Sequence, residues 1–181
     1  MKQDFGELDD GATHLTVNNR LAAELRRQHD AARHAAGRRV WPSADILPWR
    51  AWLTRLYERL LDDGFTDRDL LSPAQEQVLW LDAIDTVKRT PTLLRPQAAA
   101  RSAMQAYALC RDWQVDERDL DGGGEDTRLF LAWRHAFEAR VDRDRLLTAA
   151  QLLPLLQRAF DSGALPPPAR LYSITRKFSL V

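Results

Sequence analysis

The chain has 181 residues, 45% of them hydrophobic and 29% charged, as expected for a globular protein with a sizeable core. Its 26 basic and 26 acidic side chains cancel, which excludes a global attraction to nucleic acid and leaves only local patches. A single cysteine excludes an internal disulfide framework, and no apolar run approaches the roughly 18 to 20 residues of a membrane span. The acidic N-terminus has no hydrophobic segment of the kind found in secretory signals. We therefore expect a soluble, cytoplasmic protein with no membrane partner.

The first elements predicted are a short strand and a basic helix. His14–Val17 is compatible with a strand, and Asn18 and Asn19 are suitable N-caps because an Asx side chain accepts an amide proton of the first helical turn. The apolar residues of the following helix share one face: Leu21, Leu25, Ala32 and Ala36. Gly37 stands where this helix is expected to stop.

Two helices with apolar stripes are predicted next. The first is Trp-rich, begins after Asp45 and Pro48, ends at Asp62-Asp63-Gly64, and has this stripe: Trp49, Trp52, Leu53, Leu56, Leu60 and Leu61. The second starts at a capping box formed by Ser72 and Gln75 and ends at Thr90-Pro91. Its stripe consists of Trp80, Leu81, Ile84 and Val87.

Three more helices complete the helical pattern. One begins near Pro96, and its narrow inward face is predicted to hold Ala99, Ala103, Ala106, Leu109, Cys110 and Trp113. The next has a larger inward stripe: Leu129, Phe130, Trp133, Phe137 and Val141. Thr148 and Gln151 suggest a second capping box ahead of the last helix, whose apolar residues are Leu152, Leu155, Leu156, Ala159 and Phe160. Pro154 either kinks that helix or marks a later start.

The fold class predicted is mainly α: five to six helices with a minimal two- or three-stranded parallel β element near the termini. Gly163 and the Pro166–Pro168 run end the last helix. Leu171–Ile174 is the other strand candidate.

Residues with catalytic or metal-binding potential do not form a site in the sequence. Gly122–Gly124 lacks the lysine of a phosphate loop and favours a flexible linker, and His29 and His34 do not share a helical face. Asp142 and Asp144 alternate with arginines, which is typical of a solvated charge run. Cys110 is expected to be a small buried hydrophobe, and the four histidines to lie at the surface or its boundary. No catalytic residue, metal or cofactor is predicted, so we do not expect an enzyme.

One local electrostatic signal stands out between residues 18 and 40. This segment contains six arginines but only two acidic residues, Glu24 and Asp30, so it carries a local net charge of +4. Guanidinium groups bind backbone phosphates well. Trp41, beside Arg38 and Arg39, is a candidate for base stacking, whereas the other tryptophans are expected in the core. A solvated helix face explains the same arginines without a ligand.

The segments LTVNNRLAAELRR and DILPWRAWLTRL resemble the N-terminal part of a bacterial family of probable DNA repair proteins. These proteins are related to the AddB subunit of helicase–nucleases and carry a C-terminal PD-(D/E)XK nuclease domain. Their N-terminal half is similar to a superfamily I helicase core that has often lost its ATPase motifs. The resemblance implies that Thr16–Ala22 is the strand-to-helix segment that touches single-stranded DNA in helicases, and that Ile46–Trp49 is the next strand and turn. It also implies that His14–Val17 and Leu171–Ile174 pair with or neighbour each other in parallel, as strands of a helicase core do.

The resemblance also implies a division of the chain. Residues 1–12 would be a flexible lead-in, residues 13–65 a helicase-like piece, residues 66–165 a helical insert, and residues 166–181 a Pro-rich turn with a short strand and tail. The pattern is incomplete, because no phosphate loop precedes Thr16, no Asp-Glu pair follows Ile174, and the nuclease domain is absent. The expected piece is therefore a non-catalytic fragment of a longer protein.

Two functions remain open. In the first, the fragment contacts the backbone of single-stranded DNA through these residues: Asn18, Asn19, Arg20, Arg26, Arg27, Arg38, Arg39 and Trp41. In the second, it is a helical interaction or structural module that packs against the missing domains of a longer parent chain or against a partner subunit, without binding nucleic acid. An unrelated helical adaptor is a third interpretation, if the resemblance is accidental. The distinguishing feature is whether the arginines of residues 20–39 converge on one open surface.

Overall fold

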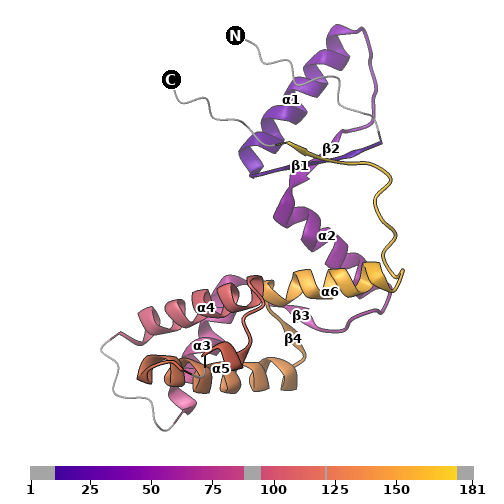
Figure 1. Cartoon of the computed structure of the whole chain (residues 1–181). Helices are drawn as coiled ribbons and strands as arrows, with labels where there is room; N and C mark the ends of the chain where they lie inside the picture. Colours follow the sequence, from indigo (N-terminus) through magenta and orange to yellow (C-terminus); the bar gives the residue numbers. More distant parts are fainter. Residues whose placement is uncertain (1–10, 88–94, 121, 175–181) are drawn as a thin grey trace. The chain divides into compact units, whose positions relative to one another are not determined.

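The computed structural model describes residues 11–87, 95–120 and 122–174 (Figure 1). The chain divides into two compact units, Met1–Leu60 with Ala159–Val181 and Leu61–Arg158. The boundaries fall within two helices, α2 (Trp49–Asp62) and α6 (Ala149–Asp161). Within the described ranges, six α-helices and two small parallel sheets confirm the predicted fold class.

The first unit is built on a three-stranded parallel sheet in the order β2-β1-β5. The central strand β1 (Thr13–Thr16) pairs with β2 (Asp45–Pro48) on one side and with β5 (Leu171–Ile174) on the other. The predicted parallel pairing of the two terminal strand candidates is therefore confirmed. The strand ends before Val17, whose side chain is exposed.

Helix α1 (Asn19–Ala35) covers one face of this sheet. Asn18 caps it as predicted, with its side-chain oxygen accepting the Leu21 amide at 2.9 Å. Ala22 and Leu25 are buried against Ile46 of β2. The predicted stripe is wrong in its second half, where Ala32 and Ala36 are exposed and His29 is buried instead. A four-residue strand is shorter than a 17-residue helix, so the C-terminal half of α1 extends past the end of the sheet and has no sheet surface to pack against.

Helix α2 follows β2 directly and is tied to the sheet by Asp45. The Arg55 guanidinium donates to both carboxylate oxygens of Asp45, at 2.8 and 3.0 Å, and the Thr13 hydroxyl donates to the same carboxylate at 2.6 Å. The hydrogen bonds from Arg55 lower the pKa of Asp45 below its usual range, against the opposing effect of partial burial. The helix buries most of its predicted stripe, namely Trp52, Leu53, Leu56 and Leu60.

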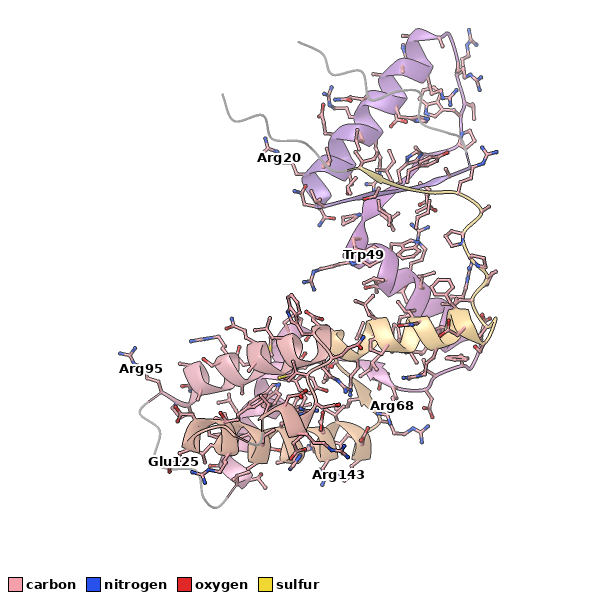
Figure 2. The ribbon with its side chains drawn as sticks, in the orientation of Figure 1. Arg20, Trp49, Arg68, Arg95, Glu125 and Arg143 are labelled. Atoms are coloured by element: carbon pink, nitrogen blue, oxygen red, sulfur yellow. The ribbon has the colours of Figure 1, made fainter. Side chains whose placement is uncertain are left out.

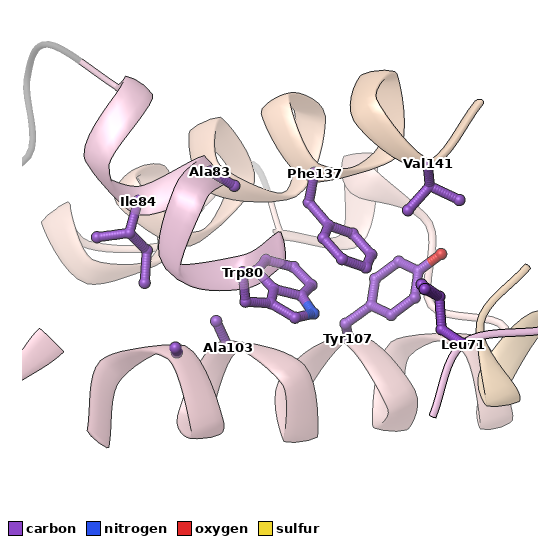
Figure 3. Packing of buried hydrophobic residues seen from close by; sticks show 9 residues of the cluster. Leu71, Trp80, Ala83, Ile84, Ala103, Tyr107, Phe137 and Val141 are labelled. Carbon is purple, nitrogen blue, oxygen red and sulfur yellow. The ribbon is translucent and has the colours of Figure 1, made fainter. Parts of the chain in front are cut away.

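The second unit has an aromatic core between α3 (Pro73–Thr86), α4 (Pro96–Asp112) and α5 (Glu125–Arg143) (Figure 3). The Trp80 and Phe137 rings stack with centroids 4.1 Å apart, and the Tyr107 ring meets both edge-on at 5.7 and 5.5 Å. Each of the three helices contributes one of these rings. Offset and edge-to-face contacts of this kind stabilise a core beyond the area they bury.

The buried face of α4 differs from the predicted one. Ala100, Ala103 and Tyr107 are buried, whereas Leu109 is 58% exposed and Trp113 is 78% exposed, and Cys110 is only half-buried. The alanines give two overlapping helical stripes, so spacing alone did not distinguish them. The fit of Tyr107 against Trp80 and Phe137 selects the face that is buried.

Local capping signals are confirmed at two helix starts. Ser72 and Gln75 form the capping box of α3. At α6 the Thr148 amide donates to the Gln151 side chain and the Gln151 amide donates to the Thr148 hydroxyl, which completes a second capping box. Helix α6 therefore starts at its predicted cap and contains Pro154 inside it.

A two-residue parallel pair of β3 (Asp69–Leu70) and β4 (Leu146–Leu147) was not predicted. Helix α3 ends at Thr86 with Val87 as its C-cap, so it stops before the predicted Thr90-Pro91, which lies outside the described residues.

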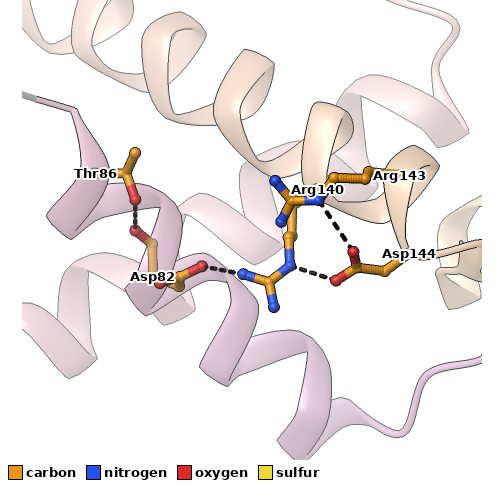
Figure 4. A network of polar contacts seen from close by, with 5 residues as sticks. All are labelled: Asp82, Thr86, Arg140, Arg143 and Asp144. Atoms are coloured by element: carbon orange, nitrogen blue, oxygen red, sulfur yellow. Dashed lines mark hydrogen bonds and ion pairs between the residues drawn. The ribbon is translucent and has the colours of Figure 1, made fainter.

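The predicted charge run at the end of α5 is an ion-pair network (Figure 4). Arg140 binds both Asp144 and Asp82, at 2.8 Å from the latter, so it joins α5 to α3. Arg143 binds Asp144 at 3.1 Å, and Asp142 pairs with Arg68 at 2.9 Å. Hydrogen bonds from Arg140 and Arg143 lower the pKa of Asp144.

The prediction for the histidines is half wrong. His34 and His135 are exposed, but His14 and His29 are buried. His14 lies within the central strand and stacks on Tyr172 with ring centroids 5.3 Å apart.

No helix among the described residues is long and apolar enough to cross a membrane.

Candidate nucleic-acid interface

Two helices of the first unit begin at the same edge of the sheet. Strands β1 and β2 are parallel, and each leads into a helix, α1 or α2, at its carboxyl end. In open parallel sheets ligands bind at this edge, where the helix N-termini carry partial positive charge. Neither helix has an acidic residue in its first turn, and each has an arginine there, Arg20 in α1 and Arg50 in α2.

Three of the predicted contact residues lie at this edge. Asn18, Asn19 and Arg20 are all exposed, and Arg20 projects away from the start of α1 (Figure 2). The side-chain oxygen of Asn18 is used by the helix cap, which leaves its amide nitrogen to donate. A phosphate at the start of α1 would meet backbone amides and one guanidinium group.

A cavity of about 530 Å³ opens beside these residues. Its lining combines Leu15, Thr16, Val17, Trp49, Leu171 and Ser173. Val17 is 62% exposed and Trp49 is 43% exposed, although both are large and apolar. Trp49 also contacts Trp52, with ring centroids 5.2 Å apart, which holds the exposed indole in place.

The exposure of Trp49 corrects the prediction that it lies in the core. Trp49 is the first residue of α2, so the sheet ends before the helix can bury it. The sequence did contain a signal, because Pro48 precedes Trp49 and fixes the helix start there. A tryptophan at the start of a helix after a strand is a candidate ligand contact.

Arg26 and Arg27 have partners within the first unit. The Arg26 guanidinium donates to the Ile46 carbonyl, through Nε at 3.0 Å and through a second nitrogen. Arg27 pairs with Glu24 one turn away, at 2.7 and 3.1 Å, and the hydrogen bonds to Glu24 raise the pKa of Arg27. Both guanidinium groups are thus occupied by intramolecular bonds.

Arg38, Arg39 and Trp41 lie beyond the opposite end of α1. That helix has 17 residues and is therefore about 25 Å long, so these residues are well separated from Arg20. Arg38 and Arg39 are exposed, whereas the Trp41 indole donates to Asp30 at 2.9 Å and lowers the pKa of that carboxyl. Asn18, Asn19 and Arg20 share the start of α1, whereas Arg26 and Arg27 lie along the helix, and the other three predicted contacts lie beyond its far end.

No metal site is evident in the part of the chain that the structure describes. Among those residues, no group of three or more His, Cys, Asp or Glu side chains is placed to hold a metal ion.

The second unit has an apolar surface of a different kind. Its three most exposed large apolar side chains among the described residues are Trp113, Val78 and Leu109, and two of them, Leu109 and Trp113, lie one turn apart at the end of α4. A groove of about 280 Å³ runs between α4 and α5, lined by Ala99, Ser102, Ala103, Ala106, Asp126, Leu129, Phe130 and Trp133. Exposed apolar surface of this kind is typical of protein contacts.

No protein-family model matches this chain, and no curated protein is significantly similar to it in sequence.

Proposed function

We propose that the chain is a non-catalytic, helicase-like piece of a DNA repair protein that contacts the backbone of single-stranded DNA. The observation that supports this most is the carboxyl edge of the first sheet, where Arg20 and Trp49 are both exposed beside two helix N-termini. Arginine and backbone amides bind phosphates, and an exposed tryptophan stacks a base without regard to sequence.

This proposal shifts the predicted contacts toward the start of α1. Asn18, Asn19 and Arg20 remain, and Trp49 takes the stacking role first expected of Trp41. Arg26 and Arg27 instead hold α1 together and fix it to β2. Arg38 and Arg39 would meet DNA only if a strand followed the length of the helix.

The test is binding of a labelled oligothymidine by the whole chain at low salt. We expect Trp49→Ala to weaken binding by about 1–3 kcal/mol, the usual contribution of one stacked base. Trp113→Ala is the matched control, because Trp113 is also exposed but belongs to the second unit. Equal loss in both variants would contradict a stacking site at Trp49.

A second candidate function is a protein-interaction module with no nucleic-acid binding. The exposed Leu109 and Trp113 on α4 favour it. Size-exclusion chromatography with light scattering, on the wild type and on a Leu109→Ser/Trp113→Ser variant, tests self-association through this surface. A monomeric wild type would exclude a second copy of the chain as the partner.

A further inference from the structure

The second unit contains a cavity of about 500 Å³ whose walls are unlike those of the other cavities. Three arginines line it from three different elements: Arg68 before β3, Arg111 at the end of α4 and Arg158 in the last turn of α6. Phe65, Leu147 and Leu155 supply apolar wall. All of these residues belong to the same compact unit.

The acidic residues at the cavity do not neutralise all three cations. Asp142 pairs with Arg68 at 2.9 Å, and Asp67 pairs with Arg145, which lies outside the lining. Arg68 is also fixed by the Leu146 carbonyl at 3.1 Å. Two positive charges, Arg111 and Arg158, therefore remain uncompensated at the cavity.

Arg111 is held in place without an anionic partner. Its guanidinium carbon lies 5.6 Å from the centroid of the buried Tyr107 ring, a cation–π distance. Its Nε is buried and has no hydrogen-bond acceptor among the described residues. The ring contact positions the guanidinium without neutralising its charge, so the charge is left for a ligand in the cavity that Arg111 lines. Arg158 is exposed and has no ion pair within the described ranges, so it is available to the same ligand.

We propose that this cavity binds a small organic phosphate. Arg111 and Arg158 hold the phosphoryl group, because guanidinium groups form paired, charge-assisted hydrogen bonds with phosphate oxygens. The apolar or aromatic body of the ligand lies against Phe65, Leu147 and Leu155, since a fully hydrated anion would leave that wall uncovered. The site lies in the second unit and does not depend on the DNA contact proposed for the first.

Isothermal titration of the whole chain with thymidine monophosphate tests the proposal. We expect a dissociation constant on the order of 1 mM or tighter, with no detectable binding of thymidine and weaker binding of inorganic phosphate. Arg111→Gln and Arg158→Gln should each weaken binding about tenfold. Arg101→Gln, an exposed arginine of α4 outside the cavity, should bind like the wild type.

The outcomes separate this site from the first unit. An Arg20→Ala/Trp49→Leu variant should keep its affinity for thymidine monophosphate, even if it loses oligonucleotide binding. Unchanged binding by Arg158→Gln, whose exposed side chain can be altered without disturbing the core, would overturn the proposal. So would inorganic phosphate binding as tightly as the nucleotide, or no binding of the nucleotide at about 10 mM.

Discussion

Gly123 occupies a backbone position that has no room for a methyl group. A Cβ added there would lie 2.5 Å from Cβ, Cγ2 and Oγ1 of Thr127, which is nearer than real Cβ contacts allow. Its amide also donates to the Leu120 carbonyl at 2.9 Å, so the Gly122–Gly124 segment is a tight turn into α5. We expect Gly123→Ala to lower the free energy of unfolding by about 1–3 kcal/mol.

Gly122→Ala is the matched control, because its added Cβ would meet nothing within 4 Å. Urea denaturation of both variants measures the difference. The flexible linker expected from three consecutive glycines would tolerate both changes equally, so similar midpoints would restore that interpretation.

Glu76 is a buried carboxyl group in the second unit, with 5% of its surface exposed. Burial raises its pKa, and the indole of Trp80 one turn away opposes the rise. A raised pKa in the folded state gives stability that is present below the ordinary value of 4.5 and is lost as pH rises through the folded-state pKa. Glutamine stays neutral, so we expect Glu76→Gln to be more stable than the wild type at neutral pH.

The difference should disappear below pH 4.5, where the wild-type carboxyl is protonated in both states. Melting temperature measured against pH for both proteins checks this, with Glu58→Gln as an exposed control. A wild type more stable than Glu76→Gln at neutral pH would show that the ionised carboxylate has a stabilising partner.

At the scale of elements, Arg26 joins α1 to the edge strand β2. Its guanidinium donates two hydrogen bonds to the Ile46 carbonyl. Ile46 belongs to β2, which is an edge strand because the sheet order is β2-β1-β5. Bonds to charged groups contribute more than neutral ones, so Arg26→Ala should destabilise the fold by about 1.5–3 kcal/mol. Arg20→Ala should change stability by less than about 0.5 kcal/mol, because Arg20 is an exposed surface residue.

Chemical denaturation of the two variants provides the comparison. Equal stability of the two single variants would mean that the bonds to Ile46 are too exposed to matter.

Elements whose signals are local could be predicted from the sequence. The capping boxes at Ser72 and Thr148 and the Asn18 cap each depend on residues three or four apart, and all three form. The parallel pairing of the terminal strands was also predicted, but from the resemblance to a helicase core and not from local spacing. The β3–β4 pair was not predicted, because a strand of two residues is too short to show the alternation of apolar and polar residues that identifies strands.

Tertiary contacts determined which side chains are buried where the spacing of apolar residues in the sequence did not. Tyr107 selected the buried face of α4, and the end of the sheet left Trp49 exposed. Of the candidate site, the start of α1 was predicted, whereas the occupied guanidinium groups of Arg26 and Arg27 depend on partners that only the structure identifies.

On the scale of the whole molecule, each of the two units has its own core. The first contains the sheet and the DNA contact that we propose, and the second contains the aromatic cluster and the arginine-lined cavity. With a net charge of zero, the chain has no long-range attraction to DNA, so any binding depends on a few local contacts.

The salt dependence of single-stranded DNA binding measures how many phosphate contacts the first unit makes. Each arginine–phosphate contact contributes about −0.7 to the slope of log affinity against log salt, so the two arginines at this edge, Arg20 and Arg50, predict a slope of about −1.4. Arg20→Ala should flatten the slope by about 0.7, whereas Arg101→Ala in the second unit should leave it unchanged. No binding by the wild type at about 50 mM salt, or the same slope for Arg20→Ala and the wild type, would contradict the account.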